Sequence, residues 1–260
     1  MMLLSPVSAA PVTFWFAGQV ARTNSHSTAL PLGIEIGTPF AGRVTYDADF
    51  IDYQSTSAGG DIGNYYFRTL AGFSAHIQMG THTLTNARIA TSGWSGNISV
   101  YNDFQNADQM FIDIGQAGLI MDGQQHTNSV IELYLNDQSL SAHASRSLPT
   151  QGPTAVAFPD QRELTWTEQD GHGKLLFGLS GSITHLTTAP LVLLNVRRLD
   201  NDQLRISWPL AVSGGTLEES DGLAPEDWHP VGEDVLPDGM ENAVILPPGS
   251  PARFFRLILP

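Results

Sequence analysis

A two-residue alternation of apolar and polar side chains, sustained from Gly72 to Asp103, constrains the fold of this 260-residue chain more than any other feature. The first part of the stretch places apolar residues at every second position: Phe73, Ala75, Ile77 and Met79. Successive side chains of a strand point to opposite sides, so this pattern predicts a strand buried on one face. Gly80-Thr81 then predicts a tight turn, and the threonine-rich run 81–90 predicts the partner strand.

The same alternation recurs along the chain between turns rich in glycine, asparagine and aspartate. The further segments that show it are 12–22, 40–46, 65–67, 110–114, 131–135, 164–166 and 175–183. Asp170-Gly171 stands between two of them and is a strong hairpin signal. Many short strands at regular spacing predict an all-β protein, an antiparallel β-sandwich of jelly-roll-like form.

The amino-acid composition changes at Thr187-Thr188-Ala189-Pro190, beyond which prolines become frequent and acidic residues cluster. Leu204, Ile206 and Trp208 predict one strand there, and the alternation over 254–259 predicts another. We therefore expect a β-sandwich domain over 11–189 and a small β-rich C-terminal module over 190–260.

The first ten residues, MMLLSPVSAA, resemble the end of a secretory signal peptide. Ser8-Ala9-Ala10 supplies the small residues at which a signal peptidase cuts, although a basic start and a full apolar core are missing. We expect 1–10 to be the remnant of a signal peptide; a simple lead-in to the first strand is the alternative. No apolar run reaches the length that spans a bilayer, so we expect no membrane span.

Composition narrows the classes of partner. The net charge is −14 and Lys174 is the only lysine, so nucleic acid is excluded as a partner, because phosphate binding needs a basic stripe. The chain has no cysteine, which excludes disulfides and thiolate metal sites. The acidity is that of a soluble extracellular protein.

Residues 12–186 resemble the β-sandwich body of bacterial exported proteins that often carry a PEP-CTERM sorting tail. The segments that carry the resemblance are Phe16 to Val20 (FAGQV), Gly37 to Asp47 (GTPFAGRVTYD), Ile98 to Asp103 (ISVYND), Leu133 to Asp137 (LYLND), Ser147 to Pro149 (SLP) and Gly181 to Leu186 (GSITHL). The resemblance implies a secreted or envelope-associated bacterial protein without an assigned activity, and it supplies no catalytic residues.

The C-terminal residues are similar to a small terminal module of secreted proteins of planctomycete and verrucomicrobial type. The matching residues are Leu204 to Pro209 (LRISWP), Leu217 to Ser220 (LEES), Leu223, Trp228, Val231 and Ala252 to Leu257 (ARFFRL). The chain departs from the sorting family at this end, since it has no Pro-Glu-Pro signal followed by an apolar helix and a basic stop. The departure indicates release or noncovalent attachment.

Two kinds of binding site are hypotheses at this point. Four aspartates in one loop, Asp47, Asp49, Asp52 and Asp61, supply the oxygen ligands that calcium prefers, although aspartate is also a common turn former. His76 and His82 flank the predicted turn and offer two imidazoles, but a zinc site needs a third ligand.

Aromatic residues beside polar ones are candidates for stacking on a sugar ring, because sugars offer apolar ring faces edged with hydroxyls. The candidates are Trp15, Trp94, Tyr101, Tyr65 and Tyr66. Core or inter-sheet packing is the alternative role of each.

These observations favour a non-catalytic exported envelope or extracellular-matrix protein, associated with polysaccharide or the cell surface and requiring no cofactor. A carbohydrate-binding module is one alternative. A secreted glycoside hydrolase is another, with Glu132 and Glu163 on or beside predicted strands as its paired carboxylates. No nucleophile elbow, phosphate-binding loop or zinc-protease helix motif occurs in the sequence.

Overall fold

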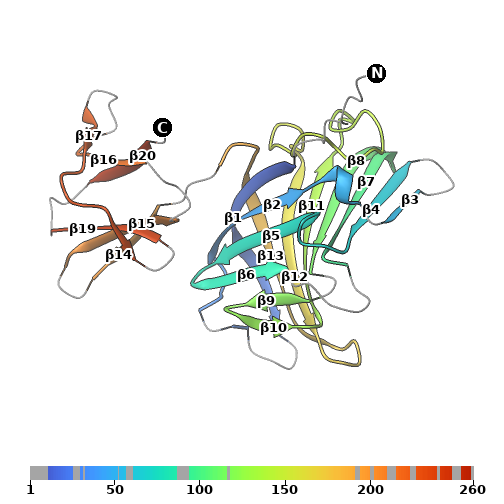
Figure 1. Ribbon diagram of the computed structural model, residues 1–260, viewed down its shortest axis with the longest axis horizontal. Helices are drawn as coiled ribbons and strands as arrows, with labels where there is room; N and C mark the ends of the chain where they lie inside the picture. Colours follow the sequence, from blue (N-terminus) through green and yellow to red (C-terminus); the bar gives the residue numbers. More distant parts are fainter. Residues whose placement is uncertain are drawn as a thin grey trace, which may run out of the picture. The chain divides into compact units, whose positions relative to one another are not determined.

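A computed structural model describes the chain over 11–25, 30–31, 33–51, 53–56, 61–86, 94–115, 118–190, 194–199, 202–209, 215–222, 227–238, 241–247 and 253–258. The chain divides into two compact units, 1–191 and 192–260. The described residues form strands joined by turns and loops, without an α-helix (Figure 1). Residues 1–10, the expected signal-peptide remnant, lie outside this described part.

The described residues of the first unit form thirteen strands and the 3₁₀ turn η1. In chain order these are β1 (Val12–Ser25), β2 (Pro39–Tyr46), η1 (Ala48–Phe50), β3 (Tyr53–Thr56), β4 (Ile62–Phe67), β5 (Phe73–Met79), β6 (His82–Asn86), β7 (Gly96–Phe104), β8 (Ala107–Ile114), β9 (Leu119–Met121), β10 (Gln124–His126), β11 (Ser129–Asp137), β12 (Gln161–Gln169) and β13 (Leu175–Thr187). The hairpins predicted at Gly80-Thr81 and at Asp170-Gly171 are confirmed as the β5–β6 and β12–β13 turns.

All thirteen strands belong to one antiparallel sheet in the order β10-β9-β6-β5-β2-β1-β13-β12-β11-β8-β7-β4-β3. The chain crosses back and forth between the β10-to-β1 half and the β13-to-β3 half, two strands at a time until β11, β12 and β13 complete the second half together, and the halves face each other. A Cβ atom added to Gly96 of β7 would lie 2.2 Å from the ring of Phe73 on β5, although β5 and β7 belong to opposite halves. The predicted jelly-roll-like antiparallel sandwich is confirmed (Figure 1).

Alternate residues of both halves supply one shared core. Its largest fully buried side chains are Phe14, Phe16, Phe40, Tyr46, Phe67, Phe73, Phe158 and Trp166. The indole nitrogen of Trp166 donates to the hydroxyl of Ser129 at 2.7 Å, so its polar atom is satisfied inside the core. Burying each such side chain contributes about 1.5–3 kcal/mol.

The sheet folds over where β1 meets β13. Glycine residues let the backbones of these two strands lie close to each other and to the ring of Phe40. A Cβ on Gly18 would lie 2.0 Å from the carbonyl oxygen of Ser182 and 2.7 Å from the ring of Phe40. A Cβ on Gly181 would lie 2.4 Å from the same ring. The pairing register shifts twice along this strand pair, after Ala17 and after Val20. Such irregularities increase local twist, which lets one continuous sheet supply two layers.

A long connection between β11 and β12, residues 138–160, packs on the sandwich without strands of its own. It is held by Asp137, whose buried carboxylate accepts hydrogen bonds from the backbone amides of Ser139, Ser141 and Ala142. These bonds and those from the serine hydroxyls outweigh the effect of burial and lower the pKa of Asp137 to about 2. The hydroxyl of Tyr46 donates to the carbonyl of Pro149 at 2.7 Å.

The second unit is the expected small β module. One sheet has the order β14 (Asn195–Arg198), β15 (Leu204–Pro209), β19 (Glu241–Leu246), β18 (Leu236–Asp238), and the other has the order β17 (His229–Pro230), β16 (Thr216–Ser220), β20 (Phe254–Ile258). Its own core contains Ile206, Trp208, Leu217, Val244 and Leu246. Arg256 of β20 pairs with Glu218 of β16 at 2.7 Å.

Adding a methyl group at the fold-over is expected to destabilise the first unit. In Gly181→Ala the new Cβ meets the Phe40 ring and, at 2.8 Å, the carbonyl oxygen of Gln19. Overpacking of this kind costs about 1–3 kcal/mol in the free energy of unfolding. Urea unfolding measures the loss, with Gly171→Ala as the matched control, because a Cβ there meets nothing within 4 Å. Equal stability of the two variants would contradict the close packing.

Candidate functional site

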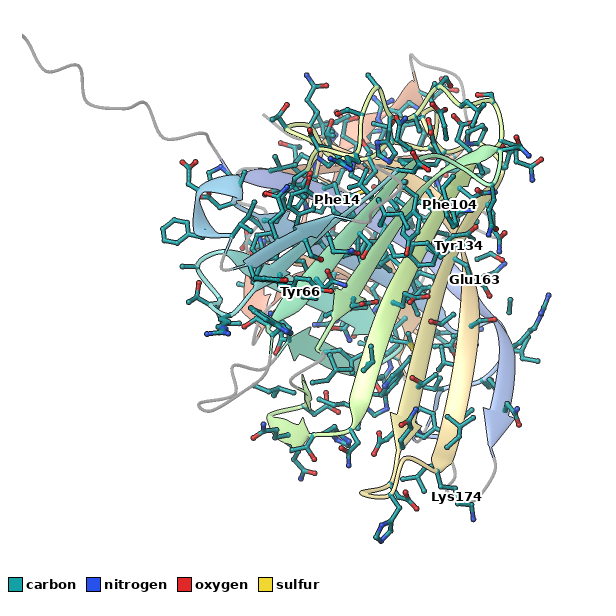
Figure 2. All side chains as sticks on the ribbon, turned by 90° about the vertical axis from the view of Figure 1, so that its right-hand side faces the viewer. Phe14, Tyr66, Phe104, Tyr134, Glu163 and Lys174 are labelled. Atoms are coloured by element: carbon teal, nitrogen blue, oxygen red, sulfur yellow. The ribbon has the colours of Figure 1, made fainter. Side chains whose placement is uncertain are left out.

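The outer surface of the β13-to-β3 half carries an unusual set of side chains. On β7 the apolar Ile98 and Val100 point into the core, so alternation places Asn97, Ser99 and Tyr101 on the outside. The neighbouring strands add further rings to this side. We name as the aromatic face the set Tyr53, Tyr66, Trp94, Tyr101, Phe104, Phe111 and Tyr134. Figure 2 looks onto it and labels Tyr66, Phe104 and Tyr134.

The rings of the aromatic face form two groups. In the first, Tyr66 lies 5.7 Å from Tyr53 and 5.1 Å from Trp94, between ring centroids. In the second, Phe111 lies 5.2 Å from Tyr101 and 4.7 Å from Tyr134. Phe111 and Tyr134 are direct cross-strand partners of β8 and β11. Aromatic pairs at this separation stabilise a sheet, and the second group forms a continuous row across three strands.

These rings remain partly open to solvent. Tyr53 is 54% exposed, and the other members of the aromatic face are half-buried. An outer sheet surface that faces only water usually carries polar side chains. A contiguous row of partly exposed rings is instead typical of a surface that binds something.

Carboxyl groups border the row. Asp113 of β8 lies opposite Glu132 of β11, and Glu163 of β12 lies opposite Tyr134. Burial, the charge of Asp113 and a hydrogen bond to it, and then the charge of Glu163 raise the pKa of Glu132 to about 7. Glu132 therefore holds a proton through the mildly acidic range and donates it in a hydrogen bond to Asp113.

Amide and hydroxyl groups continue the polar border toward β4. Asn97 donates from Nδ2 to Oδ2 of Asp113 at 3.1 Å, and the hydroxyl of Ser99 donates to Oδ1 of Asn64 at 2.7 Å. Asn97 is only 6% exposed, yet its Oδ1 has no hydrogen-bond partner among the described residues. A buried acceptor without a donor costs free energy, which a ligand donor can recover.

The tyrosines of the second group act as neutral hydrogen-bonding groups. Burial, followed by the charges of Asp113 and Glu132 and by Tyr66, raises the pKa of Tyr101. Burial also raises the pKa of Tyr134. Both phenols therefore keep their protons at physiological pH and can donate hydrogen bonds to a ligand.

The five residues predicted as glycan contacts separate in the structure. Tyr66, Trp94 and Tyr101 lie on the aromatic face. Tyr65 does not: it is 3% exposed, and its hydroxyl donates to the carbonyl of Arg146 at 2.9 Å, so it belongs to the core. Trp15 is half-buried on the outside of β1, opposite Arg43 and Thr187, and is not part of the aromatic face.

Residues that the sequence reasoning missed complete the site. Phe111, Asp113 and Tyr134 lie at its centre, although the strands MFIDI and IELYL were both recognised. Their outward positions follow from the alternation with Ile112 and Leu133, which was the available signal. Their proximity depends on the β8–β11 register, which no local pattern gives.

The carboxylates proposed for glycoside hydrolysis lie on neighbouring strands. Glu132 is opposite Thr165 and Glu163 is opposite Tyr134, so the two glutamates are diagonal neighbours on β11 and β12. Glu163 is labelled beside Tyr134 in Figure 2. Glu132 makes its hydrogen bond not with Glu163 but with Asp113, on β8, the neighbour of β11 on the side away from β12.

The structure describes three of the four aspartates predicted as calcium ligands, Asp47, Asp49 and Asp61. Asp47 caps the turn η1, where its carboxylate accepts from the backbone amide of Asp49 at 2.9 Å, and Asp61 directly precedes β4. Asp52 lies outside the described residues. Within the described ranges no three histidine, aspartate or glutamate side chains are placed to hold a metal ion.

His76 and His82, which flank the β5–β6 turn, do not lie together. His76 is opposite Thr85 and His82 is opposite Met79, so the two imidazoles belong to opposite faces of the β5–β6 hairpin. His82 instead contacts Asp122, with 2.6 Å between Nδ1 and Oδ2.

No family of known proteins, no curated protein sequence and no solved structure matches this chain. The part of the chain that the structure describes also contains no helix long and apolar enough to cross a membrane. The functional argument therefore depends on the geometry of the aromatic face and its carboxyl border.

Replacing Glu132 is expected to change how stability depends on pH. In the wild type the pKa of the Glu132 carboxyl rises from 4.5 to about 7 on folding, so the folded state binds more protons than the unfolded state between these values. The folded protein therefore loses stability as the pH rises through this range. Glu132→Gln keeps the shape and removes this loss. It should be more stable than wild type at pH 8 by about 1–3 kcal/mol, after allowing for solvent screening of a half-buried group.

Urea unfolding at pH 4 and pH 8 measures this difference. The advantage of Glu132→Gln should be absent at pH 4. Glu35→Gln, in the loop before β2, is the control and should follow the wild type at both values. An unchanged pH dependence in Glu132→Gln would show that Glu132 is an ordinary solvated carboxylate.

Proposed function

We propose that this chain is a non-catalytic exported protein of the bacterial envelope or extracellular matrix that binds polysaccharide on its aromatic face. The observation that carries this proposal is the row Tyr101–Phe111–Tyr134, half-buried on the outside of three adjacent strands and bordered by carboxyl and amide groups. The proposed location rests on the resemblance of residues 12–186 to exported PEP-CTERM-type proteins.

The chemistry of the face suits a sugar chain. Apolar faces of pyranose rings stack on flat aromatic side chains, and the hydroxyls around each ring need hydrogen-bond partners. Phe111 and Tyr134 offer adjacent rings, while Asp113, Asn97 and Glu163 offer polar atoms beside them. The strands of a sheet hold these groups in fixed register, so little side-chain entropy is lost when an extended ligand binds.

Hydrolysis of a glycoside is the second candidate, because the raised pKa of Glu132 is that of a general acid. The contact between Glu132 and Asp113 argues against this pair as the catalytic residues. Two carboxyl groups that share a hydrogen bond are closer than the roughly 5–9 Å at which glycosidase carboxylates flank a scissile bond. Glu163, the diagonal neighbour of Glu132, is the remaining partner for such a reaction.

Removing a ring from the central row should weaken polysaccharide binding. Affinity electrophoresis through dextran, hydroxyethylcellulose, soluble chitosan and alginate identifies the polysaccharide that retards the wild type. Phe111→Ala and Tyr134→Ala should each bind that polysaccharide about tenfold more weakly, since ring stacking contributes about 1 kcal/mol or more. Thermal unfolding of each variant confirms that it is folded.

Trp15→Ala is the matched control, because it removes a half-buried ring from β1, away from the aromatic face. It should bind like the wild type. Loss of binding in Trp15→Ala alone, or no retardation of the wild type by any of the four polysaccharides, would refute the proposal. Release of reducing ends from the bound polysaccharide would favour the hydrolase instead.

A further inference from the structure

The charges nearest Glu132 on the aromatic face are all negative, whereas the guanidinium of Arg68 lies over the Trp94 ring of the first group. The groups whose charges raise the pKa of Glu132 are Asp113, from β8, and Glu163, from β12. The phenol of Tyr101 on β7 also feels the charges of Asp113 and Glu132. These neighbours of Glu132, from the strands on both sides of β11, are all acids. A cation placed among them would be stabilised and would favour ionisation of Glu132.

The uncharged groups around Asp113 also favour a ligand that donates hydrogen bonds. Oδ1 of Asn97 is a buried acceptor that has no partner within the described part of the chain, on a side chain whose Nδ2 already contacts Asp113. The carboxyl oxygens of Asp113 and Glu132 are further acceptors. An ammonium group carries three N–H donors and a positive charge, so it satisfies acceptors of this kind that a sugar hydroxyl, with one donor, satisfies less completely.

Aromatic rings stand next to these acceptors. Phe111 is on β8, two residues before Asp113, and Tyr134 is on β11, two residues after Glu132, so all four side chains share the outer surface. A cation beside the face of an aromatic ring is attracted by the ring's quadrupole. Carboxylates and rings together form a surface suited to an organic ammonium group.

We propose that the glycan bound by the aromatic face carries free amino groups, with an ammonium held by Asp113, Glu132 and Oδ1 of Asn97 while its sugar ring stacks on Phe111 or Tyr134. This inference rests on the proposed polysaccharide binding and names its ligand class. A bare metal ion fits less well, because hard cations need several oxygen ligands and the described residues offer no three acidic or histidine side chains placed for one.

The test compares three β-1,4-linked hexasaccharides by isothermal titration calorimetry at pH 6: those of glucosamine, N-acetylglucosamine and glucose. The glucosamine hexamer should bind the wild type at least about tenfold more tightly than the other two. Its binding should release a proton from Glu132, seen as an enthalpy that changes with the ionisation enthalpy of the buffer. Glu132→Gln should lose both the preference and the proton release, and thermal unfolding confirms that this variant is folded.

Glu35→Gln controls for general attraction between an acidic protein and a cationic sugar, since it removes one carboxylate from an exposed loop. It should keep the full preference. An equal loss in Glu35→Gln and Glu132→Gln would overturn the inference, and so would a preference that survives in Glu132→Gln. Equal binding of all three hexamers would refute the amino-sugar ligand and leave polysaccharide binding standing. Binding of none, together with the polysaccharide panel giving no retardation, would refute both.

Discussion

The packing of aromatic rings against glycine backbone is the interaction on which the rest of the first unit depends. The ring of Phe40 fills the space where side chains of Gly18 and Gly181 would lie, and the ring of Phe16 does the same at Gly42. These contacts let β1, β2 and β13 approach closely at the place where the sheet turns over. Without the approach, the two halves could not share one core, because their apolar surfaces would not meet.

The aromatic face is a consequence of that shared core. Once Ile98, Ile112 and Leu133 are fixed inside, strand alternation leaves Tyr101, Phe111 and Tyr134 no other side on which to lie. The aromatic face also has an electrostatic character of its own. Burial, and then the neighbouring carboxyl groups of Asp113 and Glu163, raise the pKa of Glu132, and the same acids are the basis of the amino-sugar binding that we propose.

The strands, the two predicted hairpins and the sandwich could be read from the sequence, because each depends on local alternation and turn chemistry. The adjacent tyrosines show where local reasoning ends: Tyr65 and Tyr66 look alike as neighbours, but one is in the core and the other on the outer surface. Strand phase, set by Phe67 pointing inward, decides between them. The contact between Asp113 and Glu132 was beyond prediction, since it depends on register between strands separated in the chain by β9 and β10.

The pairing of β1 with β13 has a consequence for how this protein comes to be folded. β1 pairs with β2 soon after both have been synthesised, but its second neighbour, β13, ends at Thr187 and is the last strand of the unit to be made. Contacts of such high sequence separation form slowly, because a long loop must close before they stabilise anything. Most of the unit therefore emerges from the ribosome before its sheet can close.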